Sequence, residues 1–276
     1  TGLAEGTPVL VGTDDSGAES ISTGVLQPGD MMLQLGSSIY MILCTDRLVN
    51  DNRIWREEFI IPGTFDISAG TNAAGTLTRW YRDHIFGELV KAEEAGGEAA
   101  YAAMMDGIAD IAPGSDGLVT LPYFAGERTP INDPRAKGIL CGLTLAHTRK
   151  HMYRSALEAV GFSVNPHFEI FAEHKVPINK IMATGGGPKN PLWMQMNADI
   201  TGKTIHTAGV TIGASYRDAM MAAMGIKYFP SYDALAKIIK SGDTFAPDMN
   251  RHEEYKKFQA IFDELYVATK DIVHRL

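Results

Sequence analysis

The sequence predicts an α/β layer fold, in which helices pack on the faces of a sheet. Short apolar runs typical of strands come first, and helix-like segments then alternate with further strands. Glycine turns stand at several predicted strand ends, among them residues 36–38 and 185–187. Because α/β folds bind ligands at the loops beyond the strand ends, these turns are the first places to look for a site.

Length and composition describe an ordinary globular chain. Its 276 residues are enough to bury a substantial core, and one domain is the simplest account because no internal repeat or low-complexity linker interrupts them. Hydrophobic residues make up 45% and charged residues 21%, which argues against disorder. The formal net charge of -8 argues against sequence-independent binding to nucleic acid, whose phosphates require a basic face. An anion of nucleotide size requires only a local site.

The cellular compartment is predicted from what the sequence does not contain. No apolar run reaches the ~18 residues that span a bilayer, and the first residues lack the segments of a signal peptide. Cys44 and Cys141 lie far apart in apolar runs without metal-ligand spacing, so we expect buried free thiols in a reducing compartment. These features predict a soluble, cytoplasmic protein without a membrane partner.

The first strand-like run is the apolar segment 8–12, which predicts a buried strand. Acidic residues follow it, and residues 18–25 then form a short helix closed by Gly24. Either Asp14 or Asp15 caps this helix, whose first N–H groups need an acceptor. One aspartate suffices for the cap, so the second remains available for chemistry.

Two strands are predicted next, at 31–35 and 39–44, joined by a Gly-Ser-Ser sequence. This joint is either a plain hairpin turn or a turn whose hydroxyl and N–H groups hold phosphate oxygens. After a short strand at 65–68, apolar residues at helical spacing predict a helix over 72–86. Gly75 in its first turn destabilises a helix by about 1 kcal/mol relative to alanine, which indicates a close approach there.

The middle of the chain predicts surface helices and a charged loop. Residues 88–107 are rich in alanine and interrupted by two glycines, which indicates one or two surface helices without visible chemistry. Strands are predicted at 118–124 and 139–145. The loop 126–135 between them carries two acidic and two basic residues, which either bind a substrate or pair with each other.

The second half alternates helices and strands. Pro166 divides or kinks the long helical pattern at 148–171. A strand at 180–184 then leads into the glycines at 185–187. The other predicted elements are short strand or loop pieces at 203–206 and around Val210, and helices at 213–224, 231–241 and 251–275.

Residues 183–193 form the stretch around which the other elements are interpreted. They indicate a strand, a glycine turn and a helix start, with Asn190 as the N-cap and Pro191 as the first helical residue. Glycines leave backbone N–H groups uncovered, and a helix start adds partial positive charge, a combination that suits phosphate or a nucleotide. The alternative is an ordinary strand-to-helix turn, since a glycine cluster alone is a weak signal.

Five segments that occur in a particular order carry a family resemblance. They are residues 11–19, 35–38, 74–80, 122–130 and 185–190. With them the chain resembles, from about residue 8 to about residue 230, the C-terminal half of the FGGY carbohydrate kinases, a family of xylulose, ribulose, gluconate and glycerol kinases. It looks closest to the xylulose-kinase-like members. The resemblance implies an actin-like ATPase (ribonuclease H-like) α/β fold over residues 1–276, with a mixed sheet flanked by helices.

The resemblance also implies roles for individual residues. Asp15, favoured over Asp14 by its spacing to Gly24, is the implied catalytic base that accepts the proton of the sugar hydroxyl. The implied nucleotide contacts, of which the first two hold phosphates, are Gly36, Ser37, Gly75, Arg79, Gly186 and Asn190. Ser37 replaces the threonine of the family, and Arg79 departs from the glutamine of the glycerol kinases. The cofactors implied are ATP and Mg²⁺, and no residue is assigned as a metal ligand.

Two features of the family are not found in this sequence. FGGY kinases begin with an Asp-x-Gly-Thr strand and turn, and the preceding domain supplies most sugar contacts. We therefore expect this chain to be the C-terminal nucleotide-binding domain, truncated or separately expressed, whose missing partner is the N-terminal sugar-binding domain. The expected substrate is a small sugar, a ketopentose such as xylulose, and a homodimer is the other assembly considered. The chain alone should bind nucleotide weakly and turn over nothing.

Other classes of protein share some of these features. An actin-like or chaperone-like ATPase module would have the same fold and glycine turns but would act on a protein partner. A noncatalytic sugar-binding relative would also keep the fold. A dinucleotide-binding oxidoreductase would need Gly-x-Gly-x-x-Gly after a first strand, which the sequence lacks.

Overall fold

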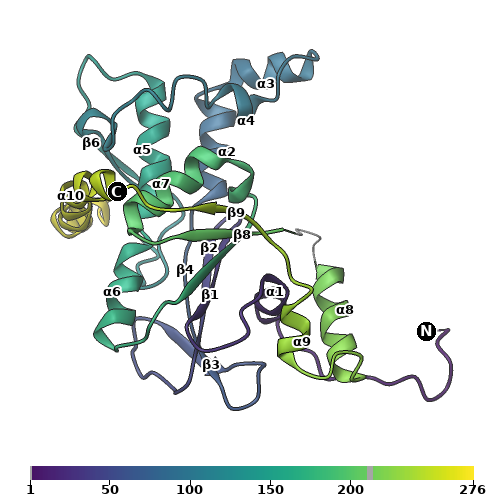
Figure 1. The fold of residues 1–276 in the computed structure, drawn as a ribbon. Helices are drawn as coiled ribbons and strands as arrows, with labels where there is room; N and C mark the ends of the chain where they lie inside the picture. Colours follow the sequence, from purple (N-terminus) through teal and green to yellow (C-terminus); the bar gives the residue numbers. More distant parts are fainter. Residues whose placement is uncertain (1, 210–213) are drawn as a thin grey trace.

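A mixed sheet of seven strands forms the centre of the computed structural model, which describes residues 2–209 and 214–276 (Figure 1). The strands, in spatial order, are β3 (Trp55–Glu58), β4 (Phe65–Thr71), β2 (Ile39–Thr45), β1 (Asp30–Leu35), β7 (Lys180–Gly185), β8 (Ile205–Ala208) and β9 (Ser241–Phe245). β7 pairs in parallel with both β1 and β8, and the other neighbours are antiparallel. A separate antiparallel pair consists of β5 (Val119–Leu121) and β6 (Ile139–Cys141).

Helices cover both faces of the sheet. Successive strand residues point to opposite sides, so each central strand contributes side chains to a core on either face. The helices are α1 (Asp15–Thr23), α2 (Gly75–His84), α3 (Gly87–Glu94), α4 (Ala100–Ala103), α5 (Arg149–Phe162), α6 (Asn165–Glu173), α7 (Pro191–Thr201), α8 (Ala214–Gly225), α9 (Tyr232–Ala236) and α10 (Met249–Val273), with short 3-10 helices at Ser115–Gly117 and Gly187–Lys189. Leu33 belongs to the core formed with α2, α5 and α7, whereas its neighbour Met32 belongs to the core formed with α1, α8 and α9. The latter three helices lie together on one side of the sheet (Figure 1).

Several predicted elements are confirmed with small changes of boundary. The strands predicted at 31–35 and 39–44 are β1 and β2, joined by the Gly-Ser-Ser turn. Pro166 follows the first residue of α6, so the helical pattern at 148–171 is divided into α5 and α6. Gly24 ends α1 in the left-handed conformation, with a φ of 91°.

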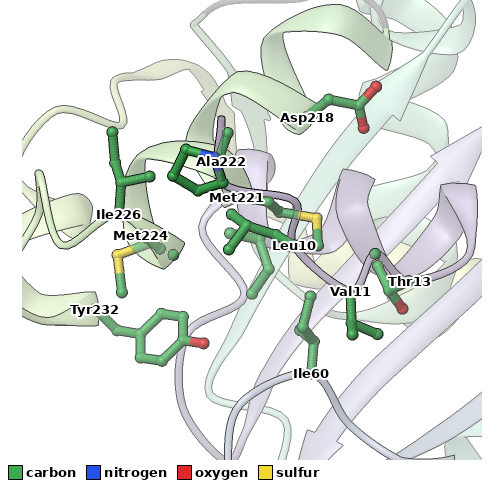
Figure 2. Close-up of a pocket in the computed structure, with 14 residues that line it drawn as sticks. Leu10, Val11, Thr13, Ile60, Asp218, Met221, Ala222, Met224, Ile226 and Tyr232 are labelled. Atoms are coloured by element: carbon green, nitrogen blue, oxygen red, sulfur yellow. The ribbon is translucent and has the colours of Figure 1, made fainter. Parts of the chain in front are cut away.

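The prediction of a buried strand at 8–12 is wrong. In the structure this segment has no strand partner within the described chain, and Val9 and Val11 are 92% and 97% exposed. Leu10 instead packs against Gly225 of α8, beside a hollow of about 580 Å³ whose lining is mainly apolar (Figure 2). An apolar run indicates that its residues are hydrophobic, but it does not show whether a neighbouring strand is present to pair with its backbone. In the described chain this segment pairs with no strand.

Other corrections concern the ends of elements. Cys44 is buried as predicted, but Cys141 is exposed. It is the last residue of β6, one of the two strands of the small antiparallel pair. The strand predicted at 139–145 is shorter in the structure, where β6 ends at Cys141. Within the helix predicted at 231–241, the structure has only the short helix α9. Residue 241, the last residue of the predicted helix, is the first residue of β9, which pairs with β8. The predictions that fall on Val210 and on residue 213 lie outside the described residues.

Candidate active site

One cavity of about 890 Å³ brings together all six residues that the sequence analysis named as nucleotide contacts. Its lining includes Gly36, Ser37, Gly75, Arg79, Gly186 and Asn190. The sheet explains how distant segments meet there: β1 and β7 are parallel, and Leu35 pairs with Gly185, so both strands end at the same edge. The turns that follow these two strands are therefore neighbours in space.

Gly75 allows the first turn of α2 to lie against the turn after β1. Its N–H donates to the carbonyl oxygen of Gly36 at 2.9 Å, and a Cβ added at Gly75 would lie 2.5 Å from that same oxygen. The backbone N–H groups of Ala74 and Thr76 both donate to the carbonyl oxygen of Ser37. The close approach predicted at Gly75 is thus an approach of backbone to backbone, which holds the Gly-Ser-Ser turn at the cavity.

The three glycines after β7 differ in what surrounds them. Gly185 has a φ of 90°, and a Cβ there would lie 2.7 Å from the carbonyl oxygen of Leu35. A Cβ on Gly187 would lie 2.5 Å from the Cβ of Leu35. Gly186 has an ordinary φ of -83°, and a Cβ there would meet nothing closer than 4.0 Å. The fold itself requires glycine at positions 185 and 187. At Gly186 no protein atom occupies the space where a Cβ would lie, and this residue lines the cavity.

Asn190 is the N-cap of α7, as predicted. Its Oδ1 accepts a hydrogen bond from the N–H of Trp193 at 3.1 Å, and Pro191 occupies the first helical position. Its Nδ2 lies 3.1 Å from the sulfur of Met105. A cap is therefore part of what Asn190 does, and its side chain also lines the cavity.

The structure shows which of the two aspartates caps α1. Asp14 is the N-cap, since its Oδ1 accepts a hydrogen bond from the N–H of Gly17 at 2.9 Å. Asp15 is the first residue of α1, is exposed, and does not line the cavity.

Glu19 ties α1 to the two strands that carry the turns. Its Oε2 accepts from Nε2 of Gln34 at 2.6 Å, and its Oε1 accepts from the hydroxyl of Thr184 at 2.9 Å. Gln34 lies on β1 two residues before Gly36, and Thr184 lies on β7 one residue before Gly185. The position of Asp15 is thereby coupled to the ends of β1 and β7.

Comparison with known proteins decides the family. Residues 31–226 match the model of the C-terminal domain of the FGGY family of carbohydrate kinases. The chain belongs to this family. The predicted resemblance is confirmed.

Individual relatives agree with this membership. The chain is 30% identical over 276 residues to the xylulose kinase of Bacillus subtilis (strain 168), covering 99% of the chain and 53% of that protein. It is also 30% identical over 289 residues to the ribulokinase of Anoxybacillus flavithermus, covering 100% of the chain and 51% of that protein. The chain thus spans about half the length of the curated relatives it matches.

Solved structures confirm the actin-like ATPase fold. The xylulose kinase of Rhodospirillum rubrum matches with a TM-score of 0.89 and 28% identity, covering 99% of this chain and 54% of that one. The glycerol kinase of Plasmodium falciparum, solved with ADP, matches with a TM-score of 0.75 at 17% identity, covering 91% and 50% of the two chains. The second likeness concerns the fold alone.

Sugar kinases of the FGGY family use ATP, and the residues at the cavity suit a nucleotide. Residues of the turns and helix starts line the cavity together with the basic side chains of Arg79 and Lys189 and with aromatic side chains such as Trp193. For Mg²⁺, the described residues contain no group of three or more histidine, cysteine, aspartate or glutamate side chains placed to hold a metal ion. Mg²⁺ is usually held by one or two carboxylates together with substrate phosphates.

One set of residues that line the cavity was not predicted from the sequence. Ala99, Tyr101, Ala102 and Met105 line it, although residues 88–107 were assigned no chemistry. Their side chains are small, apolar or aromatic, so no polar motif marks them. Tyr101 packs against Arg82 of α2, whose Cζ lies 5.2 Å from the centre of its ring. Alanine predicts a surface helix here, but its small side chain also leaves room for a ligand beside this segment.

Of the two roles predicted for the charged loop 126–135, pairing of its charges with each other is wrong, and substrate binding stays a prediction. No ion pair joins its own acidic and basic side chains in the described part of the chain. Oε1 of Glu127 accepts from the N–H groups of Asn72 and Arg128, and burial raises the pKa of Glu127 to about 7. Asp133 pairs with His274 and accepts from the hydroxyl of Tyr266. These charges anchor the loop to the end of β4 and to the C-terminal end of the chain.

No helix in the described ranges is both long enough and apolar enough to cross a membrane.

Proposed function

We propose that this chain is the ATP-binding, C-terminal half of a sugar kinase that phosphorylates a hydroxyl group of a ketopentose, with xylulose as the first candidate. One observation supports this most: the six residues named as nucleotide contacts come from three segments of the chain and line one cavity. Xylulose kinases and ribulokinases among the relatives point to a ketopentose. The sugar-binding N-terminal half is the proposed partner of this chain.

In the proposed reaction the sugar oxygen forms a bond to the γ-phosphorus of ATP while the bond from phosphorus to the bridging oxygen of ADP breaks. Asp15 accepts the proton of the sugar hydroxyl as that bond forms. Catalysis then depends chiefly on in-line positioning and on stabilisation of negative charge.

The cavity residues have separate tasks in this proposal. Gly36 and Ser37 present backbone and hydroxyl groups to the phosphates, while Gly75, Gly186 and Asn190 surround the nucleoside. Arg79 and Lys189 supply positive charge along the cavity wall. Mg²⁺ bound across the phosphates would neutralise part of their charge. Closure of the two halves over the substrates would exclude water and suppress hydrolysis of ATP.

Two measurements test the proposal. Calorimetric titration of the 276-residue chain with ATP should give weak, saturable binding. The complete polypeptide, in which the sugar-binding half precedes this chain, should consume ATP only when a ketopentose is present. ATP consumption that ignores every sugar of a ketose panel would contradict the proposal and favour an actin-like or chaperone-like ATPase.

A further inference from the structure

The side chain of Glu19 reaches from α1 to two neighbouring strands of the sheet. Its Oε2 accepts a hydrogen bond from Nε2 of Gln34 at 2.6 Å, and its Oε1 accepts one from the hydroxyl of Thr184 at 2.9 Å. Gln34 and Thr184 are paired residues of the parallel strands β1 and β7. Glu19 therefore contacts both strands at the same level, just before the turns that line the cavity.

The polar residues that Glu19 contacts face α1 because side chains alternate along a strand. Met32, two residues before Gln34, packs in the core formed with α1, α8 and α9, so Gln34 points to the same side of the sheet. Thr184 is paired with Gln34 and is 5% exposed. A buried hydroxyl requires a hydrogen-bond partner. The hydrogen bonds of Glu19 thus satisfy polar groups that the strands hold beneath α1.

The same face of α1 carries Asp15, the proposed base. Residues four apart in an α-helix are neighbours on one face, and Asp15 and Glu19 both belong to α1. The second half of the helix is packed into the core, where Ile21 is 1% exposed. Apolar packing alone has no preferred direction, whereas hydrogen bonds are directional. Glu19 therefore fixes the rotation and the height of the helix face that carries Asp15.

The turns of the cavity are held by other contacts. The N–H of Gly186 donates to the carbonyl oxygen of Leu35 at 2.9 Å, and the N–H of Gly75 donates to the carbonyl oxygen of Gly36 at 2.9 Å. These hydrogen bonds join backbone to backbone and do not involve Glu19. Loss of the Glu19 side chain should therefore release α1 from the two strands and leave the turns in place.

We propose that Glu19 is a positioning residue for phosphoryl transfer, which sets the distance and the direction from Asp15 to the phosphates bound at the turns after β1 and β7. The proposal rests on the proposed function and on Asp15 as its base. Phosphoryl transfer depends on in-line placement of the reacting groups, and a misplacement of ~1 Å lowers the rate by about a hundredfold. Glu19 acts through its hydrogen bonds to the strands, so its negative charge is not what the reaction requires.

Variants of the complete polypeptide separate positioning from a role of the charge. Glu19→Ala removes both hydrogen bonds and should lower kcat about tenfold to a hundredfold, with the KM for ATP little changed. Glu19→Gln should recover most of this loss, because its amide oxygen accepts from Gln34 while its amide nitrogen donates to the hydroxyl of Thr184. Glu264→Ala is the control, at an exposed glutamate of α10 outside the cavity, and should match the parent.

A second comparison is made in polypeptides that already carry Asp15→Asn. If Glu19 acts only by placing the carboxylate of Asp15, adding Glu19→Ala to Asp15→Asn should lower kcat by no more than about twofold, because no base remains to be misplaced. Transfer of radiolabelled phosphate from ATP to the sugar measures these slow rates. A residue that only holds the fold together would lower kcat by the same factor with and without Asp15.

The outcomes separate this proposal from the proposed function. A parent polypeptide that consumes no ATP in response to a ketopentose contradicts the proposed function. With that activity present, a normal kcat in Glu19→Ala or in Asp15→Asn overturns the positioning role. A kcat in Glu19→Gln as low as that in Glu19→Ala also overturns it, because the charge of Glu19 would then be required.

Two further results would also overturn the positioning role. One is an equal loss of kcat on adding Glu19→Ala with and without Asp15. The other is weaker ATP binding by the Glu19→Ala form of the 276-residue chain, measured by calorimetry, because Glu19 would then hold the turns. Circular dichroism shows whether each variant keeps the fold. If Glu19→Ala does not fold, Thr184→Val takes its place in every comparison, since it has nearly the same shape and removes one of the two hydrogen bonds.

Discussion

Two regions of the molecule are built from different material. At the cavity, the glycine turns after β1 and β7 and the helix starts beside them contribute backbone to the lining. The sheet face of β2, β3 and β4 instead carries the side chains of Tyr40, Trp55 and Asp66, and Arg128 of the loop beside β4 lies over the Trp55 ring. Glu19 links α1 to β1 and β7, whose ends carry the turns.

This difference has a chemical reason. All nucleoside triphosphates carry the same phosphates, and backbone N–H groups at turns and helix starts can bind them in any sequence that keeps the turns. Side chains on a sheet face instead present individual donors and acceptors, which single substitutions can change.

The largest expected effect is at the proposed base. Asp15→Asn in the complete polypeptide should lower kcat by about a hundredfold to ten-thousandfold, with the KM for ATP little changed, because the carboxylate acts as the sugar hydroxyl ionises. Asp14→Asn is the matched control, since asparagine caps a helix about as well as aspartate. If Asp14→Asn loses turnover and Asp15→Asn keeps it, the base is Asp14 and the assignment made here is wrong.

The cavity is tested at the one glycine whose missing side chain the fold does not require. Gly186→Ala should weaken ATP binding about tenfold to a hundredfold, because the new methyl group occupies space that the nucleotide needs. Its stability should remain near that of the parent chain, given the φ of -83° and the nearest atom at 4.0 Å. Gly87→Ala is the control, at a glycine outside the cavity with no atom within 4 Å of an added Cβ. Equal ATP affinity in both variants would place the nucleotide elsewhere.

Asp66 should destabilise the fold when its carboxyl group is ionised. Burial raises the pKa of Asp66 to about 7 from an ordinary value of 3.8, so the folded chain holds this proton more tightly than the unfolded chain does. The contribution of Asp66 to stability therefore falls as pH rises from about 4 to about 7, and is constant above that. Asp66→Asn should be more stable than the parent by on the order of 2 kcal/mol at pH 8 and by little at pH 4.

Urea unfolding at the two pH values measures this difference, with Asp110→Asn as a control that should show no pH-dependent gain. A loss of stability in Asp66→Asn that is equal at both pH values would mean that Asp66 accepts hydrogen bonds that hold the fold together.

The contrast between the cavity and this sheet face also explains how far the structure could be predicted from the sequence. Glycine turns, the cap at Asn190 and the division at Pro166 are local features, in which a few adjacent residues determine the backbone, and the structure confirms them. The presence of Tyr40, Trp55 and Asp66 on one sheet face depends on strand register, which no short segment encodes. Residues 99–105 were missed for a related reason, because alanine and methionine acquire a role only from what lies opposite them.

The segment 8–12 shows the converse error. Its apolar residues satisfy the pattern of a buried strand, yet whether such a segment is covered depends on elements far away in the sequence, and here Val9 and Val11 are exposed. Asp14 and Asp15 form an intermediate case. Capping chemistry required one of them, but only the bond from Gly17 N–H to Asp14 identifies which.

The smallest expected effect separates the cap from the ligand contact at Asn190. Asn190→Ala should lower the free energy of unfolding by about 1 kcal/mol, whereas Asn190→Ser, which keeps a capping oxygen, should change it by a few tenths at most. Both variants lack the amide that faces the cavity, so both should weaken ATP binding, by about threefold to tenfold. Denaturant unfolding and ATP calorimetry on the same preparations give the two values. If Asn190→Ser binds ATP as tightly as the parent chain, Asn190 serves α7 alone, and the nucleoside end of the cavity depends on the backbone of the glycine turn and on Tyr101 and Met105 opposite it.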